Sequence, residues 1–258
     1  PRFSALVAWT EARMEEWHIP GAAIAVVEGG ELRHVAGLGV RRWGFPERVT
    51  PDTRFRVGSL SKMVAGALAA EEIAAGRLSL DAPAADVLGD VTLGTGSLAD
   101  LTLLQLASHQ SGLQTIGLPN RCDPDPALLA DELRDLAPDW ALWTPPGELY
   151  NYSNQGYSLL GLAVERSAAS WSGGATYPEL AARLFEQSGM TTATYDWVEA
   201  FAGNHATGHT MDLATGRPER YRTLDERACV ASFPSGGLMA SVTDIGHAVE
   251  MLVRGGEG

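Results

Sequence analysis

One lysine constrains this 258-residue sequence more than any other residue. The chain has 19 basic residues, and all of them are arginine except Lys62. Arginine keeps its proton at any workable pH, whereas a buried lysine can release one. Lys62 follows Ser59 in the segment Ser59-Leu60-Ser61-Lys62, a spacing at which a helix places both side chains on one face. The segment therefore predicts a helix, opening at Gly58-Ser59, that holds a serine hydroxyl against a lysine amine.

This pairing is chemically useful because serine is a weak nucleophile until a neighbouring group accepts its proton. Lysine can be that acceptor when burial or nearby cations lower its pKa. A serine at a helix N-terminus also lies beside free backbone N–H groups, which stabilise a developing oxyanion. The sequence allows a simpler interpretation as well, in which Ser59 caps the helix and Lys62 is solvated.

A second polar segment, Tyr152-Ser153-Asn154, follows the turn residues Pro145-Pro146-Gly147. Residues two apart in an extended segment share a face, so the Tyr152 and Asn154 side chains can project together. A tyrosine hydroxyl beside a lysine ammonium can have a lowered pKa and relay protons, and an asparagine amide can hold the lysine in place. The alternative is a helix-entry loop, with Asn154 as the cap and Tyr152 as a packing residue.

Periodicity and turn residues predict the helices and strands. Helices are expected at 3–18, 59–75, 101–108, 126–136, 155–169, 177–188 and 243–254. Strands are expected at 22–28 and 31–40, which form a hairpin around Gly29-Gly30, and at 54–57 and 236–241. This pattern predicts an α/β fold of the α+β type, with an antiparallel sheet flanked by helices and a helical subdomain.

The chain is expected to divide into three consecutive stretches. Residues 1–75 would form an α/β part with the N-terminal helix, the hairpin and the nucleophile helix. Residues 76–204 would form a mostly helical part, and residues 205–258 would return to the α/β part.

The net charge of −13 makes nucleic acid and anionic membranes poor partners, because both bind basic surfaces. No apolar run has the length of a membrane span. The start, Pro1-Arg2-Phe3-Ser4, has no apolar leader, which favours a cytoplasmic protein over a secreted one whose leader was removed. Cys122 and Cys229 have no metal-ligand spacing, and the sequence leaves open whether they pair. No metal or organic cofactor is expected.

In this order and at this separation, the two polar motifs resemble those of the serine β-lactamase and penicillin-binding-protein superfamily. The greatest similarity is to its branch of class C-type β-lactamases, D-peptidases and esterases. Supporting stretches are Phe55-Arg56-Val57-Gly58, residues 106–113, Pro146-Gly147-Glu148 before Tyr150-Asn151-Tyr152, and Ser235-Gly236-Gly237-Leu238. The resemblance implies a β-lactamase/transpeptidase-like fold over nearly the whole chain.

The resemblance also implies a role for each matching residue. Ser59 would be acylated, and Lys62 would take its proton. Tyr152 would protonate the leaving group and activate water for deacylation. Asn154 would orient Lys62 and bind the substrate, and Ser235-Gly236 would contribute to substrate binding. The backbone N–H of Ser59 would form half of the oxyanion hole.

The third motif of this superfamily, Lys-Thr-Gly or His-x-Gly on a strand beside the nucleophile, is absent. Lys62 is the only lysine, and none of the six histidines is followed two positions later by glycine. Relatives carry further strands after the point where this chain stops, and without them the hairpin at 22–40 would lack a neighbour. We therefore expect the C-terminal strands to be missing from this chain and to come from a second polypeptide. A truncated relative that closes its sheet in another way is the alternative.

Other candidate residues have simpler interpretations. His109 could serve a Ser-His-Asp triad, but the chain has no Gly-x-Ser-x-Gly elbow, so a capping and packing role is favoured. His205 and His209 lack the acid of a His-Glu-x-x-His motif, which favours a loop over a metal site. Three tryptophans could line a substrate pocket, although large aromatic residues more often fill the core: Trp140, Trp143 and Trp197.

The residues and the resemblance together predict a serine hydrolase that acts through an acyl-Ser59 intermediate on an ester, amide or peptide substrate. Ester hydrolysis is favoured. D-peptidase, β-lactamase and acyltransferase activities stay open, because pocket loops decide among them. The alternative is a non-catalytic binding or regulatory protein that keeps the same fold.

Overall fold

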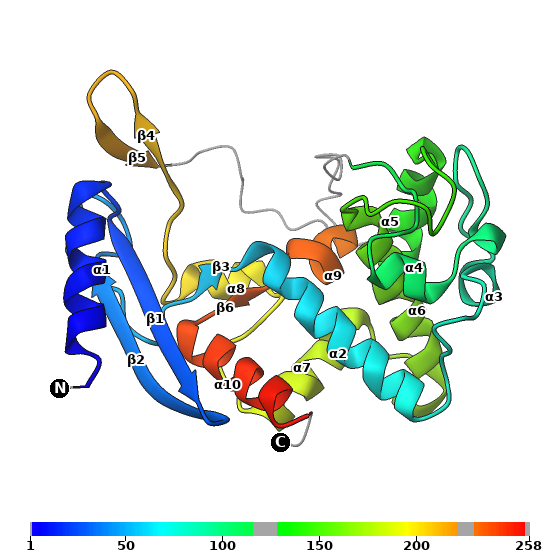
Figure 1. Cartoon of the computed structure of the whole chain (residues 1–258), viewed down its shortest axis with the longest axis horizontal. Helices are drawn as coiled ribbons and strands as arrows, with labels where there is room; N and C mark the ends of the chain where they lie inside the picture. Colours follow the sequence, from blue (N-terminus) through cyan, green and yellow to red (C-terminus); the bar gives the residue numbers. More distant parts are fainter. Residues whose placement is uncertain (1, 116–127, 221–229, 256–258) are drawn as a thin grey trace. The chain divides into compact units, whose positions relative to one another are not determined.

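The computed structural model describes residues 2–115, 128–220 and 230–255 (Figure 1). The chain divides into two compact units, each built from segments that are distant in the sequence. The first unit contains Pro1–Arg56, Phe185–Glu226 and Met239–Gly258, and the second contains Val57–Leu184 and Arg227–Leu238.

The first unit combines short antiparallel sheets with helices. Its helices are α1 (Ser4–Glu16), α8 (Trp197–Ala202) and α10 (Val242–Val253). Its strands are β1 (Gly21–Glu28), β2 (Glu31–Gly39), β3 (Phe55–Arg56), β4 (His209–Asp212), β5 (Arg217–Arg220) and β6 (Met239–Ala240). They pair as β1-β2, β3-β6 and β4-β5, each antiparallel.

The second unit is helical. Its α-helices are α2 (Ser61–Ala74), α3 (Ala85–Leu88), α4 (Leu103–Ala107), α5 (Leu129–Leu136), α6 (Asn154–Ser172) and α9 (Phe233–Gly236). Its 3₁₀ turns are η1 (Gly58–Leu60), η2 (Leu98–Asp100), η3 (Ala137–Asp139) and η4 (Val230–Ser232). The helix α7 (Tyr177–Ser188) begins in this unit and ends in the first.

The β1-β2 hairpin forms where the sequence predicts it. Gly29 and Gly30 both adopt positive φ angles, 62° and 77°, which suits a tight turn that matches the twist of the strands. The helix α10 packs against the hairpin, and a Cβ atom added to Gly246 would lie 2.6 Å from Leu32. Glycine at this position therefore lets the helix approach the sheet closely.

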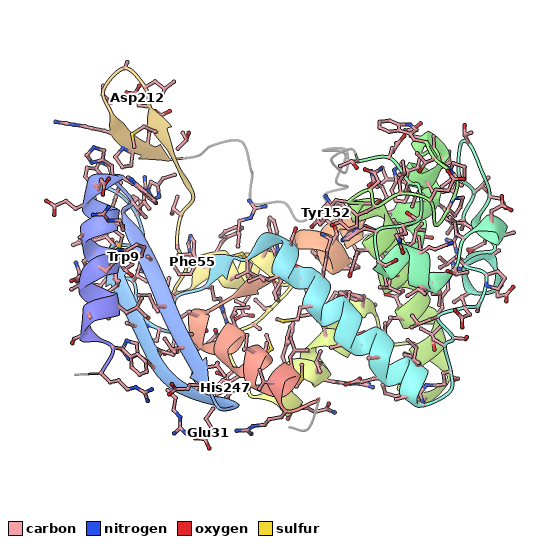
Figure 2. All side chains as sticks on the ribbon, in the orientation of Figure 1. Trp9, Glu31, Phe55, Tyr152, Asp212 and His247 are labelled. Atoms are coloured by element: carbon pink, nitrogen blue, oxygen red, sulfur yellow. The ribbon has the colours of Figure 1, made fainter. Side chains whose placement is uncertain are left out.

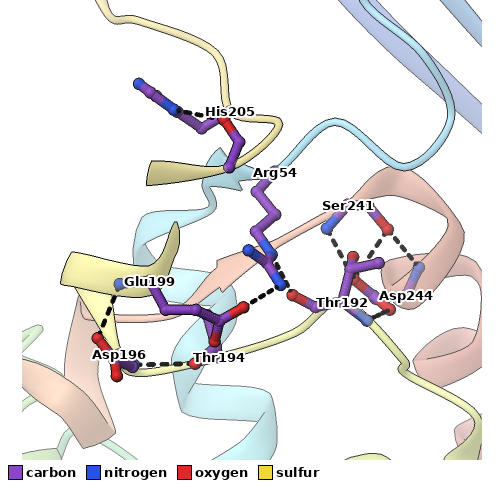
Figure 3. A network of polar contacts seen from close by, with 9 residues as sticks. Arg54, Thr192, Thr194, Asp196, Glu199, His205, Ser241 and Asp244 are labelled. Carbon is purple, nitrogen blue, oxygen red and sulfur yellow. Dashed lines mark hydrogen bonds and ion pairs between the residues drawn. The ribbon is translucent and has the colours of Figure 1, made fainter. Parts of the chain in front are cut away.

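A polar network in the first unit surrounds the short β3-β6 ladder (Figure 3). The Arg54 guanidinium donates to the Thr192 carbonyl (2.6 Å) and forms an ion pair with Glu199 (2.8 Å). Thr192 in turn donates its backbone N–H to Asp244 (3.0 Å), which also forms a capping box with Ser241 at the start of α10. The network fixes Arg54 directly before β3, the strand that leads into the Ser59 turn.

The core of the second unit is formed by α6 packed against α2, α4 and α9. The apolar residues that are fully buried there include Leu103, Leu106, Leu159, Leu160, Leu162 and Tyr177. The helix α6 begins with a side-chain cap, because the Ser153 hydroxyl accepts the Gly156 N–H (3.1 Å). It ends at Gly173, whose φ of 74° is the left-handed conformation that favours glycine at a helix end.

Residues 236–241 differ from the expected strand. Only Met239 and Ala240 are in a strand, because the preceding residues form the helical turn α9. Pro234 occupies the first turn of α9, a position that suits its fixed φ, and the Ser235 hydroxyl donates to the Ser232 carbonyl (3.2 Å). The helix α8 forms in a segment for which no separate helix was expected. The loop expected at His209 is wrong, because His209 is the first residue of β4 in the β4-β5 hairpin. Within the described residues, no helix is long and apolar enough to cross a bilayer.

Gly161 provides a test of how α6 packs against α9. A Cβ atom added there would lie 2.2 Å from Pro234, so Gly161→Ala is expected to destabilise the protein by about 1–3 kcal/mol through overpacking. The matched control is Gly66→Ala in α2, where an added Cβ atom would meet nothing within 4 Å. That change is expected to be neutral or to stabilise by up to about 1 kcal/mol. Equal urea midpoints for the two variants would contradict this packing.

Candidate active site

Ser59 lies at the centre of the 3₁₀ turn η1, which leads into α2. Its side chain is exposed. Ser61 holds this turn through two hydrogen bonds. Its buried hydroxyl donates to the Gly58 carbonyl (2.7 Å) and accepts the Leu238 N–H (3.0 Å). The predicted helix thus starts two residues later than expected, and Ser59 occupies the turn before it.

Lys62 is nearly buried, with 8% of its surface exposed. Its ammonium group donates to the Asn154 side-chain oxygen (2.8 Å), to the Ser235 carbonyl (2.6 Å) and to the Ser59 hydroxyl (3.4 Å). Three acceptors match the three N–H donors of an ammonium group, so a charge that is costly to bury is held by hydrogen bonds.

Tyr152 comes from the extended segment before α6, and Figure 2 shows it beside α9. Its hydroxyl donates to the Ser59 hydroxyl at 2.6 Å. The Lys62 nitrogen lies 4.7 Å from the centre of its ring, within cation–π range. The structure therefore brings together Ser59, Lys62, Tyr152 and Asn154, the four candidate residues of the two sequence motifs.

The pKa values of Lys62 and Tyr152 are both lowered in this arrangement. Burial lowers the pKa of Lys62, and hydrogen bonding and charge interaction with Tyr152 offset this only in part. For Tyr152, burial raises the pKa, but its interactions with Lys62 and Ser59 outweigh burial and lower it. Both pKa values thus lie closer to neutral pH than those of free lysine and tyrosine, which suits proton transfer.

Ser235 and Gly236 lie in α9, at the same site. The Ser235 side chain is 3% exposed, and its carbonyl rather than its hydroxyl binds Lys62. A Cβ atom added to Gly236 would lie 4.0 Å from the Gly58 carbonyl carbon, so this glycine borders the turn that carries Ser59. A contact of either residue with substrate stays a prediction.

The remaining candidates lie in different settings. Trp140 is buried in the second unit with 1% exposed, whereas Trp143 is 64% exposed. Trp197 is buried in the first unit, with Arg56 over its ring at 4.3 Å. His205 and His209 each bond to a backbone group, and no group of three His, Cys, Asp or Glu residues in the described ranges could hold a metal. Cys122 and Cys229 lie outside the described residues.

His109 also lies at this site, although the sequence favoured only a capping and packing role for it. It is buried, and its ring centre lies 4.3 Å from that of Tyr152. It stands more than forty positions from Tyr152, so local patterns carry no signal of their contact.

The sequence matches proteins of known family. The beta-lactamase family model matches residues 6–257. Penicillin-binding protein 4 of Amycolatopsis lactamdurans is 32% identical over 210 residues, which cover 80% of this chain and 52% of that protein. The beta-lactamase of Escherichia coli (strain K12) is 30% identical over 164 residues, which cover 61% of this chain and 40% of that protein. The chain thus spans about half the length of these relatives or less.

Solved structures give the same result for the fold. A beta-lactamase/D-alanine carboxypeptidase from Pseudomonas syringae aligns with a TM-score of 0.76 at 25% identity, over 96% of this chain and 65% of that one. The octameric penicillin-binding protein homologue from Pyrococcus abyssi aligns with a TM-score of 0.76 at 24% identity, over 97% of this chain and 56% of that one. The expected β-lactamase/transpeptidase-like fold is confirmed.

The ionisation of Lys62 can be measured directly, because the chain has no other lysine. Protein labelled with lysine that carries ¹³C at Cε should give one lysine resonance, and its titration should report a pKa below the ordinary lysine value because of burial. Asn154→Asp should raise that pKa, because a carboxylate beside Lys62 favours the ammonium form. Asn154→Ala should lower it further, because the ammonium loses an acceptor at 2.8 Å. A titration unchanged by both substitutions would show that Asn154 does not hold Lys62.

Proposed function

The chain belongs to the beta-lactamase family, and from this premise we propose that it is a serine hydrolase that cleaves an ester through an acyl-Ser59 intermediate. One observation carries the proposal. The exposed Ser59 hydroxyl lies within hydrogen-bond range of the Tyr152 hydroxyl, at 2.6 Å, and near the buried Lys62 ammonium, at 3.4 Å. A nucleophile, a proton acceptor and a buried cation beside that acceptor are the parts that activated serine hydrolysis requires.

In the first step the Ser59 oxygen attacks the substrate carbonyl carbon, and its proton moves to the Lys62–Tyr152 pair. The Ser59 backbone N–H donates to the oxyanion that forms. The bond to the alcohol then breaks, and the alcohol leaves with the proton that the pair had taken. Water next attacks the acyl carbon and gives up a proton to the same pair. The free acid leaves, and the proton returns to Ser59.

Within the pair, Tyr152 is the group nearer to Ser59, by 2.6 Å against 3.4 Å. Lys62 already donates to Asn154 and Ser235, which supports its ammonium form in the resting site. A phenolate of Tyr152, favoured by that positive charge, would be the immediate acceptor. Direct transfer to Lys62 is the alternative, and the two are separated by the substitutions described below.

An ester is the favoured substrate on chemical grounds. An alkoxide is a better leaving group than an amide nitrogen, so ester cleavage needs less proton donation to the leaving atom. The side chain next to the nucleophile, Leu60, is apolar and 45% exposed, which suits an apolar acyl or alcohol group. D-peptides and β-lactams are the next candidates, since relatives of this chain are named penicillin-binding protein and beta-lactamase.

We also propose that a strand from a further polypeptide segment binds along β1. Within the described residues β1 pairs only with β2, and residues 21–27 of this strand have no charge or proline to protect the other edge. The added segment would supply the missing third motif and the second oxyanion donor. Intact mass and a denaturing gel of the active material test this idea. A single species of 27.4 kDa with full esterase activity would rule it out.

Covalent labelling is the test of the proposed function. A fluorophosphonate is expected to form one adduct, on Ser59, because among the described residues only this hydroxyl combines exposure with contact to Tyr152 and Lys62. Peptide mapping by mass spectrometry would locate the adduct. Ser59→Ala should abolish labelling, and Ser170→Ala, at an exposed position of α6, should keep it. Wild-type protein that is folded but never labelled would support the non-catalytic alternative.

Substitutions at Lys62 and Tyr152 test the proton transfer. Lys62→Arg is expected to cost as much esterase activity as Lys62→Ala, on the order of 10²-fold or more, because arginine cannot release a proton and is too large for the lysine's three acceptors. Near-normal turnover of Lys62→Arg would mean that only the charge matters.

Tyr152→Phe should slow acylation and deacylation alike, by a similar order of magnitude. The matched control is Tyr157→Phe, since the Tyr157 ring centre lies 5.4 Å from the Lys62 nitrogen but its hydroxyl donates to the Ala107 carbonyl (2.9 Å). Rapid acylation of Tyr152→Phe, followed by a stable acyl-enzyme, would assign the first proton transfer to Lys62.

A further inference from the structure

His109 has a backbone conformation that favours another residue. It follows α4 and its capping residue Ser108, and its φ is 60°, in the left-handed region. The Gln110 N–H donates to the Gln105 carbonyl (2.9 Å), which is the bonding pattern of a helix end where glycine is usual. Within the described residues, His18 is the only other non-glycine residue with a positive φ. The turn by itself would favour glycine, so the presence of a histidine side chain here must have another reason.

Three contacts connect His109 to the segment that carries the tyrosine. The His109 carbonyl accepts the Asn151 N–H (2.7 Å), and its Nδ1 accepts the Ser153 N–H (3.1 Å). These two bonds hold the residues on either side of Tyr152. The His109 ring also lies against the Tyr152 ring, with 4.3 Å between their centres. The His109 side chain thus contacts both the Tyr152 ring and the N–H that follows it, while the His109 carbonyl binds the residue before the tyrosine.

We propose that His109 is a positioning residue that holds the Tyr152 hydroxyl on Ser59. The inference rests on the proposed function, since it assigns a residue that acts through the proton-transfer group. Tyr152 has two other supports, because Thr115 donates to its carbonyl (2.8 Å) and the Asn151 amide donates to the Leu113 carbonyl (2.7 Å). Neither touches the tyrosine ring. His109 alone, among the described contacts, reaches the ring and the N–H that follows it.

The protonation of His109 makes this support sensitive to pH. The groups that face it are Lys62 from α2, Tyr150 and Tyr152 from the loop, and Tyr157 from α6. Burial and the charge of Lys62 lower the pKa of His109, which keeps Nδ1 free to accept. When acid protonates Nδ1, that atom becomes a donor and can no longer accept the Ser153 N–H. Activity should therefore fall on the acid side as His109 gains its proton, at a pH below the ordinary histidine range.

Two substitutions separate the functions of the side chain. His109→Asn tolerates the left-handed conformation and can offer an amide oxygen to the Ser153 N–H, but it does not titrate. His109→Ala lacks both the acceptor and the ring. Ser108→Ala is the matched control, since it lies one position away and, in the described contacts, its hydroxyl bonds only to the Gln110 side chain. Thermal unfolding of each variant shows whether it is folded.

The measurement is the rate of Ser59 labelling by a fluorophosphonate, and of ester turnover, across pH. His109→Ala should lose on the order of 10- to 100-fold in labelling rate and kcat with KM changed little, because a small displacement of a catalytic group has effects of this size. His109→Asn should keep labelling within about 5-fold of the wild type and should lose the part of the acid-side decline that lies below the ordinary histidine range and that His109 protonation causes. Ser108→Ala should match the wild type in both.

A spectroscopic measurement separates failure of this inference from failure of the proposed function. The absorbance titration of Tyr152, obtained by difference from Tyr152→Phe, reports the lowered pKa of its hydroxyl in unreacted protein. His109→Ala should move that pKa upward, because the hydroxyl leaves Lys62 and Ser59. If the fluorophosphonate fails to label wild-type protein, the proposed hydrolase activity is refuted. An upward shift of the Tyr152 pKa in His109→Ala would still support the positioning role. An unchanged Tyr152 titration in His109→Ala, or an acid-side profile of His109→Asn identical to that of the wild type, would overturn it.

Discussion

The burial of one ammonium group is the constraint on which the candidate site depends. An ion removed from water costs several kcal/mol unless hydrogen bonds replace its hydration. Lys62 recovers those bonds from Asn154, Ser235 and Ser59, which belong to three different segments of the chain. Because each bond is needed to keep the charge satisfied, the lysine fixes the start of α6, the turn α9 and the turn that carries Ser59 relative to one another within the second unit.

Burial has opposite effects on the pKa values of Lys62 and Tyr152. It lowers the pKa of Lys62 but would raise that of Tyr152, and only the proximity of the cation and of Ser59 reverses the effect on the tyrosine. His109 is kept neutral by burial and by the same cation. Burial and the Lys62 charge together therefore shift the pKa values of the groups that would relay a proton and position the relay.

The surrounding fold supports Ser59 through backbone geometry. Ser59 is exposed because it lies in a 3₁₀ turn outside α2, while Ser61, two positions later, is buried and binds both Gly58 and Leu238. In the first unit, Arg54 and its network hold the β3-β6 ladder from which the chain enters this turn. The hydroxyl is thus accessible to a substrate although the turn beneath it is fixed.

The sequence by itself determined the elements whose signals are local. The single lysine, its spacing from Ser59, the Gly29-Gly30 turn and the periodicity of α6 and α10 were sufficient for those helices and the hairpin. It did not determine that Ser235 binds Lys62 through its carbonyl, that 236–241 is largely not a strand, or that His109 lies on Tyr152. The contacts of Ser235 with Lys62 and of His109 with Tyr152 join residues up to 173 positions apart. Only the tertiary structure decides them, because periodicity reports which face of an element is buried and not which distant backbone group meets it there.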